Sequence, residues 1–126
     1  MLRFAHVFFA ALWVGMMAFQ TFYLMPALGE AGPDAGKVMA GLMKRNIPTV
    51  MLVIAVIALV SGFWLFWRMS GGAPAALLAT PMGLGFAVGG GAALLAFILG
   101  ISVVRPAMMR SMQIGASLAT ASAEER

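Results

Sequence analysis

The 126-residue sequence has no cysteine and few charged residues, and each shortage excludes a class of protein. Without cysteine there is no disulfide framework, no thiolate nucleophile and no thiolate metal site. Charged residues make up 10% of the chain, against about 25% in an average soluble domain. A soluble globule made from this chain would have too few charges to cover its surface, so a soluble protein is excluded.

Apolar residues, in contrast, are abundant: they make up 63% of the chain and give it a mean hydropathy of +1.00. Disordered chains are poor in such residues, so a disordered protein is excluded as well. An integral membrane protein with one transmembrane domain, residues 1–126, remains. The net charge of +4 does not indicate a nucleic-acid partner, because the basic residues lie singly or in pairs at the ends of apolar runs.

Three apolar runs are long enough to cross the hydrocarbon core of a bilayer, which takes about 20 residues of helix. They cover residues 4–28, 47–67 and 82–104. Each run is far longer than a strand, so the sequence predicts an all-α, polytopic membrane protein with three transmembrane helices. Turn-forming residues at 29–34 and 70–74 separate the runs. Asn46 is expected to cap the second helix, with Pro48 in its first turn.

The last stretch, residues 105–126, is too polar and too short to cross the membrane. The pair Arg105-Pro106 is expected to close the third span. Three apolar residues of the tail fall near one helical face: Met108, Met112 and Leu118. This pattern predicts a short C-terminal helix that lies along the membrane interface.

The lysine and arginine residues predict an orientation in the membrane. With three spans, Arg3 and Arg68 share one side. The other six basic residues share the opposite side: Lys37, Lys44, Arg45, Arg105, Arg110 and Arg126. Because basic residues accumulate on the cytoplasmic side, we expect the N-terminus outside and the C-terminus in the cytoplasm. The expected location is the inner (cytoplasmic) membrane, with the lipid bilayer as the surroundings of the helices.

His6 is the only histidine and lies one turn into the first span. At 3.6 residues per turn it shares a narrow stripe with Ala10, Trp13, Met17 and Gln20. Lipid offers polar side chains no partner, so this stripe is expected to face protein or a cofactor. In one interpretation His6 bonds a loop or water. In the other it is an axial ligand of a haem, a chlorin or copper, either paired with Met17 or with His6 of a second copy.

The remaining chemistry of the spans is sparse. The chain has 12 methionines, and thioether ligands favour copper(I), although methionine is also a common apolar filler. All four acidic residues lie in loops or in the tail, which argues against an ion-coupled transporter. No Ser/His/Asp set and no carboxylate pair is present in the spans, so no catalytic residue is predicted.

The third span is rich in glycine. Gly85, Gly89 and Ala93 form a ridge of small residues four apart, which Ala96 and Gly100 approximately continue. A dinucleotide-binding loop is excluded, because no strand precedes these glycines. A ridge of this kind lets two helices approach closely, so we predict helix packing here, within the chain or against a partner.

Several short motifs are distributed over the three spans. The first has Leu2-Arg3-Phe4-Ala5-His6, then Leu12-Trp13-Val14-Gly15, then Tyr23-Leu24-Met25-Pro26-Ala27-Leu28. The second has Arg45, Pro48, Ser61-Gly62 and Trp64, and the third ends in Arg105-Pro106 with Arg110. Together these motifs resemble the copper-resistance D (CopD) and HemJ-like family of small integral membrane proteins.

The resemblance implies a role for His6. In that family the histidine of the first helix is associated with haem b in the HemJ-like members and with copper handling in the CopD-like members. HemJ-like proteins carry further histidine and lysine in their third helix and have a fourth span, and this sequence has neither. We therefore expect a reduced or truncated relative, without the oxidase activity.

Taken together, these features predict a non-catalytic accessory subunit of a larger energy-transducing complex, respiratory or photosynthetic. The grounds are the glycine ridge, the few polar groups in the spans and the lack of a catalytic set. Other membrane-protein subunits are the expected partners. The alternative is a membrane protein that binds haem, a chlorin or copper through His6.

Overall fold

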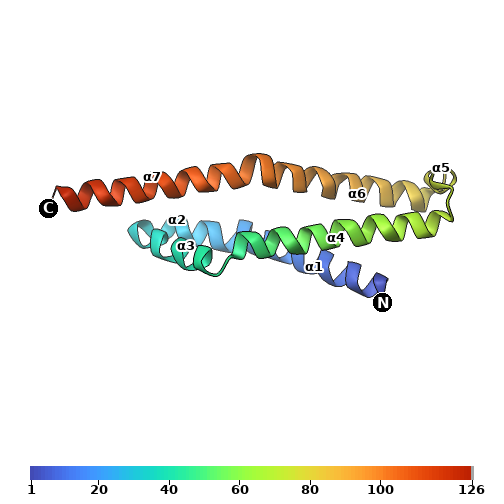
Figure 1. The fold of residues 1–126 in the computed structure, drawn as a ribbon, viewed down its shortest axis with the longest axis horizontal. Coiled ribbons are helices and arrows are strands. Elements are labelled where there is room, and N and C mark those ends of the chain that lie inside the picture. The colour runs from blue at the N-terminus through green and yellow to red at the C-terminus, as the bar shows by residue number, and fades with distance from the viewer. Residues whose placement is uncertain (126) are drawn as a thin grey trace. The chain divides into compact units, whose positions relative to one another are not determined.

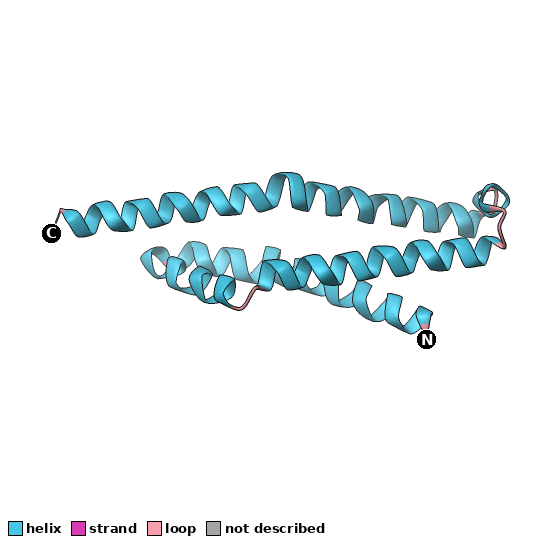
Figure 2. Ribbon diagram, in the orientation of Figure 1, coloured by secondary structure: helices cyan, strands magenta, loops and turns pink. Residues whose placement is uncertain are grey.

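The computed structural model describes residues 1–125, which are helical almost throughout (Figure 2). Within these residues there is no strand. Three helical stretches are long and apolar enough to cross a membrane: Leu2–Glu30, Ile47–Ser70 and Pro81–Glu124. The predicted all-α fold with three spans and a C-terminal helix is confirmed. The chain divides into two units, Met1–Leu94 and Leu95–Arg126. Arg126, which the sequence analysis counts among the basic residues, lies outside the described residues.

The first span is a helix with a widened turn inside it. It consists of α1 (Leu2–Phe19), the π-helical turn η1 (Gln20–Leu24) and α2 (Met25–Glu30). Pro26 follows directly after the widened turn. A proline inside an α-helix has no N–H, and its ring clashes with the carbonyl four residues earlier. In η1 the N–H of Met25 bonds instead to the carbonyl of Gln20, five residues back, which lets the helix pass the proline.

A short helical hairpin joins the first two spans. The 3-10 turn η2 (Gly32–Asp34) and α3 (Ala35–Lys44) lead into α4 (Ile47–Ser70), so the predicted break at residues 29–34 is confirmed in place. Asn46 is the N-cap residue of α4, as predicted, but its side chain makes no capping bond. Asn46 instead takes a left-handed backbone with φ 54°, which asparagine tolerates better than most residues. Pro48 lies in the first turn of α4, as predicted.

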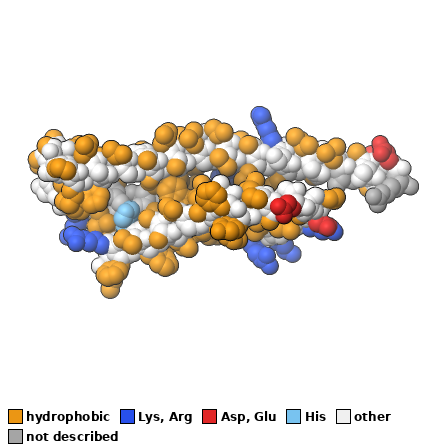
Figure 3. All heavy atoms as spheres, turned by 180° about the vertical axis from the view of Figure 1, so that it is seen from behind, with side chains coloured by type: hydrophobic (Ala, Val, Ile, Leu, Met, Phe, Trp, Pro, Cys, Tyr) orange, Lys and Arg blue, Asp and Glu red, His pale blue; other side chains and the backbone are white. Residues whose placement is uncertain are grey.

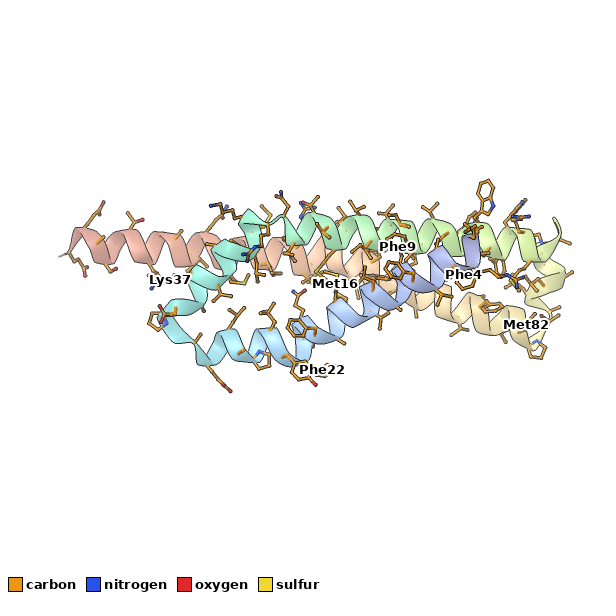
Figure 4. The ribbon with its side chains drawn as sticks, turned by 90° about the horizontal axis from the view of Figure 1, so that it is seen from below. Phe4, Phe9, Met16, Phe22, Lys37 and Met82 are labelled. Atoms are coloured by element: carbon orange, nitrogen blue, oxygen red, sulfur yellow. The ribbon has the colours of Figure 1, made fainter. Side chains whose placement is uncertain are left out.

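The helices α1 and α4 pack along each other and form the core of the first unit (Figure 1). Eight residues between Leu2 and Gln20 are better buried than the others: Leu2, Ala5, His6, Phe9, Ala10, Trp13, Met16 and Gln20. Apart from Ala5 and Ala10 they form a row in steps of four and three, which is the spacing of a left-handed coiled coil. Figure 4 shows Phe9 and Met16 on the side of α1 toward α4, whereas Phe22 points away. We call this row the α1 seam.

The facing side of α4 is built from small residues. Ala55 and Ala58 are 2% and 3% exposed, and Ser61 is 6% exposed. Small side chains let two helix backbones approach closely, which matters in a membrane because lipid gives no hydrophobic drive for helices to associate. The remaining surfaces of α1 and α4 carry exposed apolar side chains, such as Phe4 and Phe63. Apolar surface of this kind, shown in orange in Figure 3, suits contact with lipid.

After α4 the chain turns sharply and starts its third span. Gly71 and Gly72 end α4 with φ values of 59° and 85°, a backbone that favours glycine. The short helix α5 (Pro74–Leu78) and α6 (Pro81–Leu99) follow.

The helix of the third span continues through Arg105-Pro106, the pair that was expected to close the span. A second π-helical turn, η3 (Gly100–Val104), joins α6 to α7 (Arg105–Glu124) without a break in the helix. The N–H of Arg105 bonds to the carbonyl of Gly100, five residues back, as happens before Pro26. The widened turn again removes the clash through which the proline would have ended the helix. The position of α7 along the membrane interface stays a prediction.

Candidate functional site

The imidazole of His6 connects the two packed helices. Its Nδ1 lies 2.9 Å from the carbonyl oxygen of Ala58 and 3.1 Å from the hydroxyl oxygen of Ser61. The Ser61 hydroxyl itself donates to the Ala58 carbonyl at 3.1 Å. The histidine therefore forms hydrogen bonds with the backbone and with a side chain of α4. These bonds supply the polar partners that an imidazole needs inside a membrane.

These bonds determine which ring nitrogen carries the proton. A carbonyl oxygen only accepts hydrogen bonds, so Nδ1 must be the donor to Ala58. The hydroxyl hydrogen of Ser61 points to the same carbonyl, which leaves its oxygen to accept from Nδ1. In the neutral ring Nε2 is then unprotonated and keeps its lone pair, an assignment that follows from the hydrogen-bond network.

Gly62 gives the ring its space. A Cβ atom added at Gly62 would lie 2.7 Å from Cε1 of His6 and 3.5 Å from Nε2. The first distance is too short for any real side chain, so only glycine allows the ring to lie here. We call the set Ala58, Ser61 and Gly62 the histidine notch.

An apolar groove of about 390 Å³ runs beside the notch. Leu2 and Ala5 line it from α1, and Ser61 and Trp64 are among the residues that line it from α4. Ser61 thus belongs both to the notch and to the groove. His6 itself does not line the groove.

The donor set limits which cofactors fit. Across residues 1–125 no group of three or more His, Cys, Asp or Glu side chains could hold a metal ion. A bare ion that needs several His, Cys, Asp or Glu ligands is therefore a poor fit. A haem or chlorin ring supplies four nitrogen ligands to its own metal and asks the protein for one axial ligand, such as a histidine. One histidine with a free Nε2 lone pair matches that requirement.

Met17, the second predicted ligand, does not meet His6 within one chain. Both residues lie on α1, eleven positions apart, which is about 16 Å along a helix axis. Side chains that far apart cannot ligate one ion. Met17 is also 38% exposed, and it is its neighbour Met16 that lies on the α1 seam.

The predicted packing ridge of α6 has no neighbour in the described part of the chain. A Cβ added at Gly85 or Gly89 would meet no atom within 4 Å, and the same holds for Gly100 within the second unit. Ala93 is half-buried. Close packing on this ridge therefore stays a prediction. The glycine of α6 that is in tight contact is Gly83, where an added Cβ would overlap the carbonyl of Leu77.

Sequence reasoning missed the roles of Ala58, Ser61 and Gly62. Ser61-Gly62 was noticed only as part of a family-like motif, and Ala58 was not singled out. The sequence does contain a pattern that points to these residues. Small residues repeat in steps of three and four at Ala55, Ala58 and Gly62, in a helix whose other residues are mostly large. That spacing marks a face on which another helix can pack closely.

Comparison of the chain with protein-family models, with curated proteins and with solved structures finds no match. The resemblance to CopD and HemJ-like proteins stays a prediction. What can be said of the site rests on its own geometry.

Because His6 is the only histidine, ¹⁵N-histidine labelling reports this one ring. We expect the neutral ring to carry its proton on Nδ1. The substitution Gly62→Ala should displace the ring, change the ¹⁵N signals and lower the free energy of unfolding by about 1–3 kcal/mol through overpacking. NMR and denaturant titration in detergent measure these effects.

The control is Gly15→Ala on α1, where an added Cβ meets nothing within 4 Å. It should leave the histidine signals and the stability nearly unchanged. A proton on Nε2 in the wild-type protein, or unaltered signals in Gly62→Ala, would contradict the assignment.

Proposed function

We propose that this chain is a membrane protein that binds a haem or chlorin through Nε2 of His6. The observation that carries the proposal is the bond from Nδ1 to the Ala58 carbonyl. Histidines that ligate metals almost always donate their other N–H to a carbonyl, a carboxylate or water, which orients the ring and raises its basicity. Ala58 and Ser61 serve that purpose for His6.

Each residue of the site has a distinct role in this proposal. Nε2 of His6 would bind the metal of the tetrapyrrole, while Ala58 and Ser61 hold the imidazole and Gly62 leaves room for it. The neighbouring groove offers an apolar surface next to the notch. When bound, a haem supplies a redox-active iron and a chlorin supplies light absorption. Copper is a weaker candidate, because Met17 cannot act as its second ligand from the same chain.

The proposal is tested on the full chain, expressed with a supply of haem and purified in mild detergent. We expect a Soret band in the absorption spectrum. His6→Ala should remove the band, and added imidazole should restore it by occupying the vacated space and ligating the iron. Phe8→Ala, an equally helical but 62% exposed position two residues away, should keep the band.

The imidazole rescue separates ligation from folding, because free imidazole does not refold a helix pair. Lack of a Soret or chlorin band in the wild-type protein, both as purified and after addition of haem, would refute the tetrapyrrole. Copper in elemental analysis, lost in His6→Ala, would replace it with a copper site.

A second candidate is the accessory subunit of a larger respiratory or photosynthetic membrane complex. The observation that favours it is the open ridge of α6, where Gly85 and Gly89 have no neighbour within 4 Å of an added Cβ. A partner helix from another subunit can approach such a ridge closely. The two candidates are compatible, since a cofactor subunit can also belong to a complex.

The ridge is tested by Gly89→Leu. The bulky side chain should prevent close approach, so that partner subunits no longer co-purify from native membranes in mild detergent. The matched control is Gly91→Leu, which lies about 200° away around the helix and also has open space. Equal co-purification in both variants, or a wild-type chain that purifies alone, would count against a partner on this ridge.

We further propose that the protein resides in the cytoplasmic membrane with its N-terminus outside. The support is the distribution of lysine and arginine, two against six. The chain has no cysteine, so single introduced cysteines report cleanly. In intact cells an impermeant maleimide should label Ala73→Cys and should label Gly36→Cys only after permeabilisation. The reverse pattern would invert the orientation.

A further inference from the structure

Two arginines from different helices line one pocket. Arg3 lies in the first turn of α1 and Arg68 near the end of α4, and both border a cavity of about 450 Å³. Phe4, Leu65 and Met69 are among the apolar residues that line the rest. The pocket thus combines two guanidinium groups with apolar walls.

Neither guanidinium has an acidic partner among the described residues of the first unit. The acids of the first unit, Glu30 and Asp34, follow the far end of the first span, and the ion pair found in the described residues joins Asp34 to Lys37 at 2.9 Å. Arg3 and Glu30 are separated by 27 residues of helix, about 40 Å. Two like charges that share a pocket repel each other, so an anion between them is favourable.

The surroundings of the pocket are typical of the headgroup level of a bilayer. It is formed by the ends of two membrane-spanning helices, and Trp64 and Trp67 are exposed within the last two turns of α4. Tryptophan rings favour the headgroup level of a bilayer. Guanidinium groups bind phosphate through two parallel hydrogen bonds, which suits a phosphodiester better than a point charge does.

We propose that Arg3 and Arg68 bind the phosphodiester of an anionic phospholipid. The apolar walls favour a lipid over free phosphate, because Phe4, Leu65 and Met69 can contact the first methylenes of acyl chains but offer nothing to an inorganic ion. His6 does not line this pocket and its Nδ1 bonds α4, so the lipid site is separate from the proposed cofactor site.

The test uses the full chain, delipidated in mild detergent and titrated with phosphatidylglycerol, phosphatidylcholine or inorganic phosphate. Native mass spectrometry counts bound lipids and gives the affinity. We expect one tightly bound phosphatidylglycerol and much weaker binding of phosphatidylcholine. The double substitution Arg3→Gln with Arg68→Gln should weaken phosphatidylglycerol binding roughly thirty-fold, from about 1 kcal/mol per lost charge.

Two further variants keep the result interpretable. Arg3→Lys with Arg68→Lys retains the charge but loses the paired hydrogen bonds, so an intermediate affinity is expected. Lys44→Gln with Arg45→Gln removes the same charge from the other end of α4 and should leave the tight site intact. Circular dichroism checks that each variant keeps its helices.

Four outcomes overturn the proposal. Equal binding in the wild-type and Arg→Gln proteins shows that the pair does not hold lipid. Equal losses in the Lys44/Arg45 variant show a general charge effect. Competition by inorganic phosphate at comparable affinity shows a free-anion site. Loss of a Soret band without loss of lipid in the Arg→Gln protein assigns the pair to the cofactor, while an absent Soret band in all proteins bears only on His6.

Discussion

The hydrogen bond from the His6 imidazole to the Ala58 carbonyl constrains both the packing and the chemistry of the first unit. It joins two apolar helices that have no hydrophobic drive to associate in lipid. It also requires small side chains on α4 at the place where the imidazole ring packs. Gly62 lacks a side chain for that reason, and the nearby Ala55, Ala58 and Ser61 are also small and are buried. The same bond sets the tautomer of the ring. Helix packing and the chemistry available at Nε2 therefore have one common cause.

A polar contact between membrane helices is typically a modest source of stability, because the unfolded state in the membrane also finds partners. The histidine contact therefore acts mainly through specificity. It fixes which face of α1 meets α4 and at what height along the helix, since the ring fits only beside Gly62. A purely apolar pair of helices would have several nearly equal registers.

Composition and run length were sufficient to predict the three spans and the break between the first two, because the bilayer requires about 20 apolar residues per helix. Finer features depended on contacts. A 3.6-residue period placed Met17 beside His6, whereas packing against α4 follows a 3.5-residue period and selects Met16. Two local features differ from expectation: Asn46 makes no side-chain capping bond, and the helix does not end at Arg105-Pro106. In each case the backbone adopts another conformation, a left-handed residue at Asn46 and a π turn before Pro106. The roles of Ser61 and Gly62 become apparent only from the packing of α1 against α4.

The π turn before Pro26 has a consequence for which neighbour each part of the first span meets. A π turn is equivalent to one residue inserted into an α-helix, so it advances every later side chain by about 100° around the axis. The α1 seam ends at Gln20, where η1 begins, and the residues after it are out of phase with α4. Accordingly α1 packs on α4, while α2 contacts α3. The one extra residue of the π turn thus rotates the side chains that follow it, so the two parts of one transmembrane segment contact different helices.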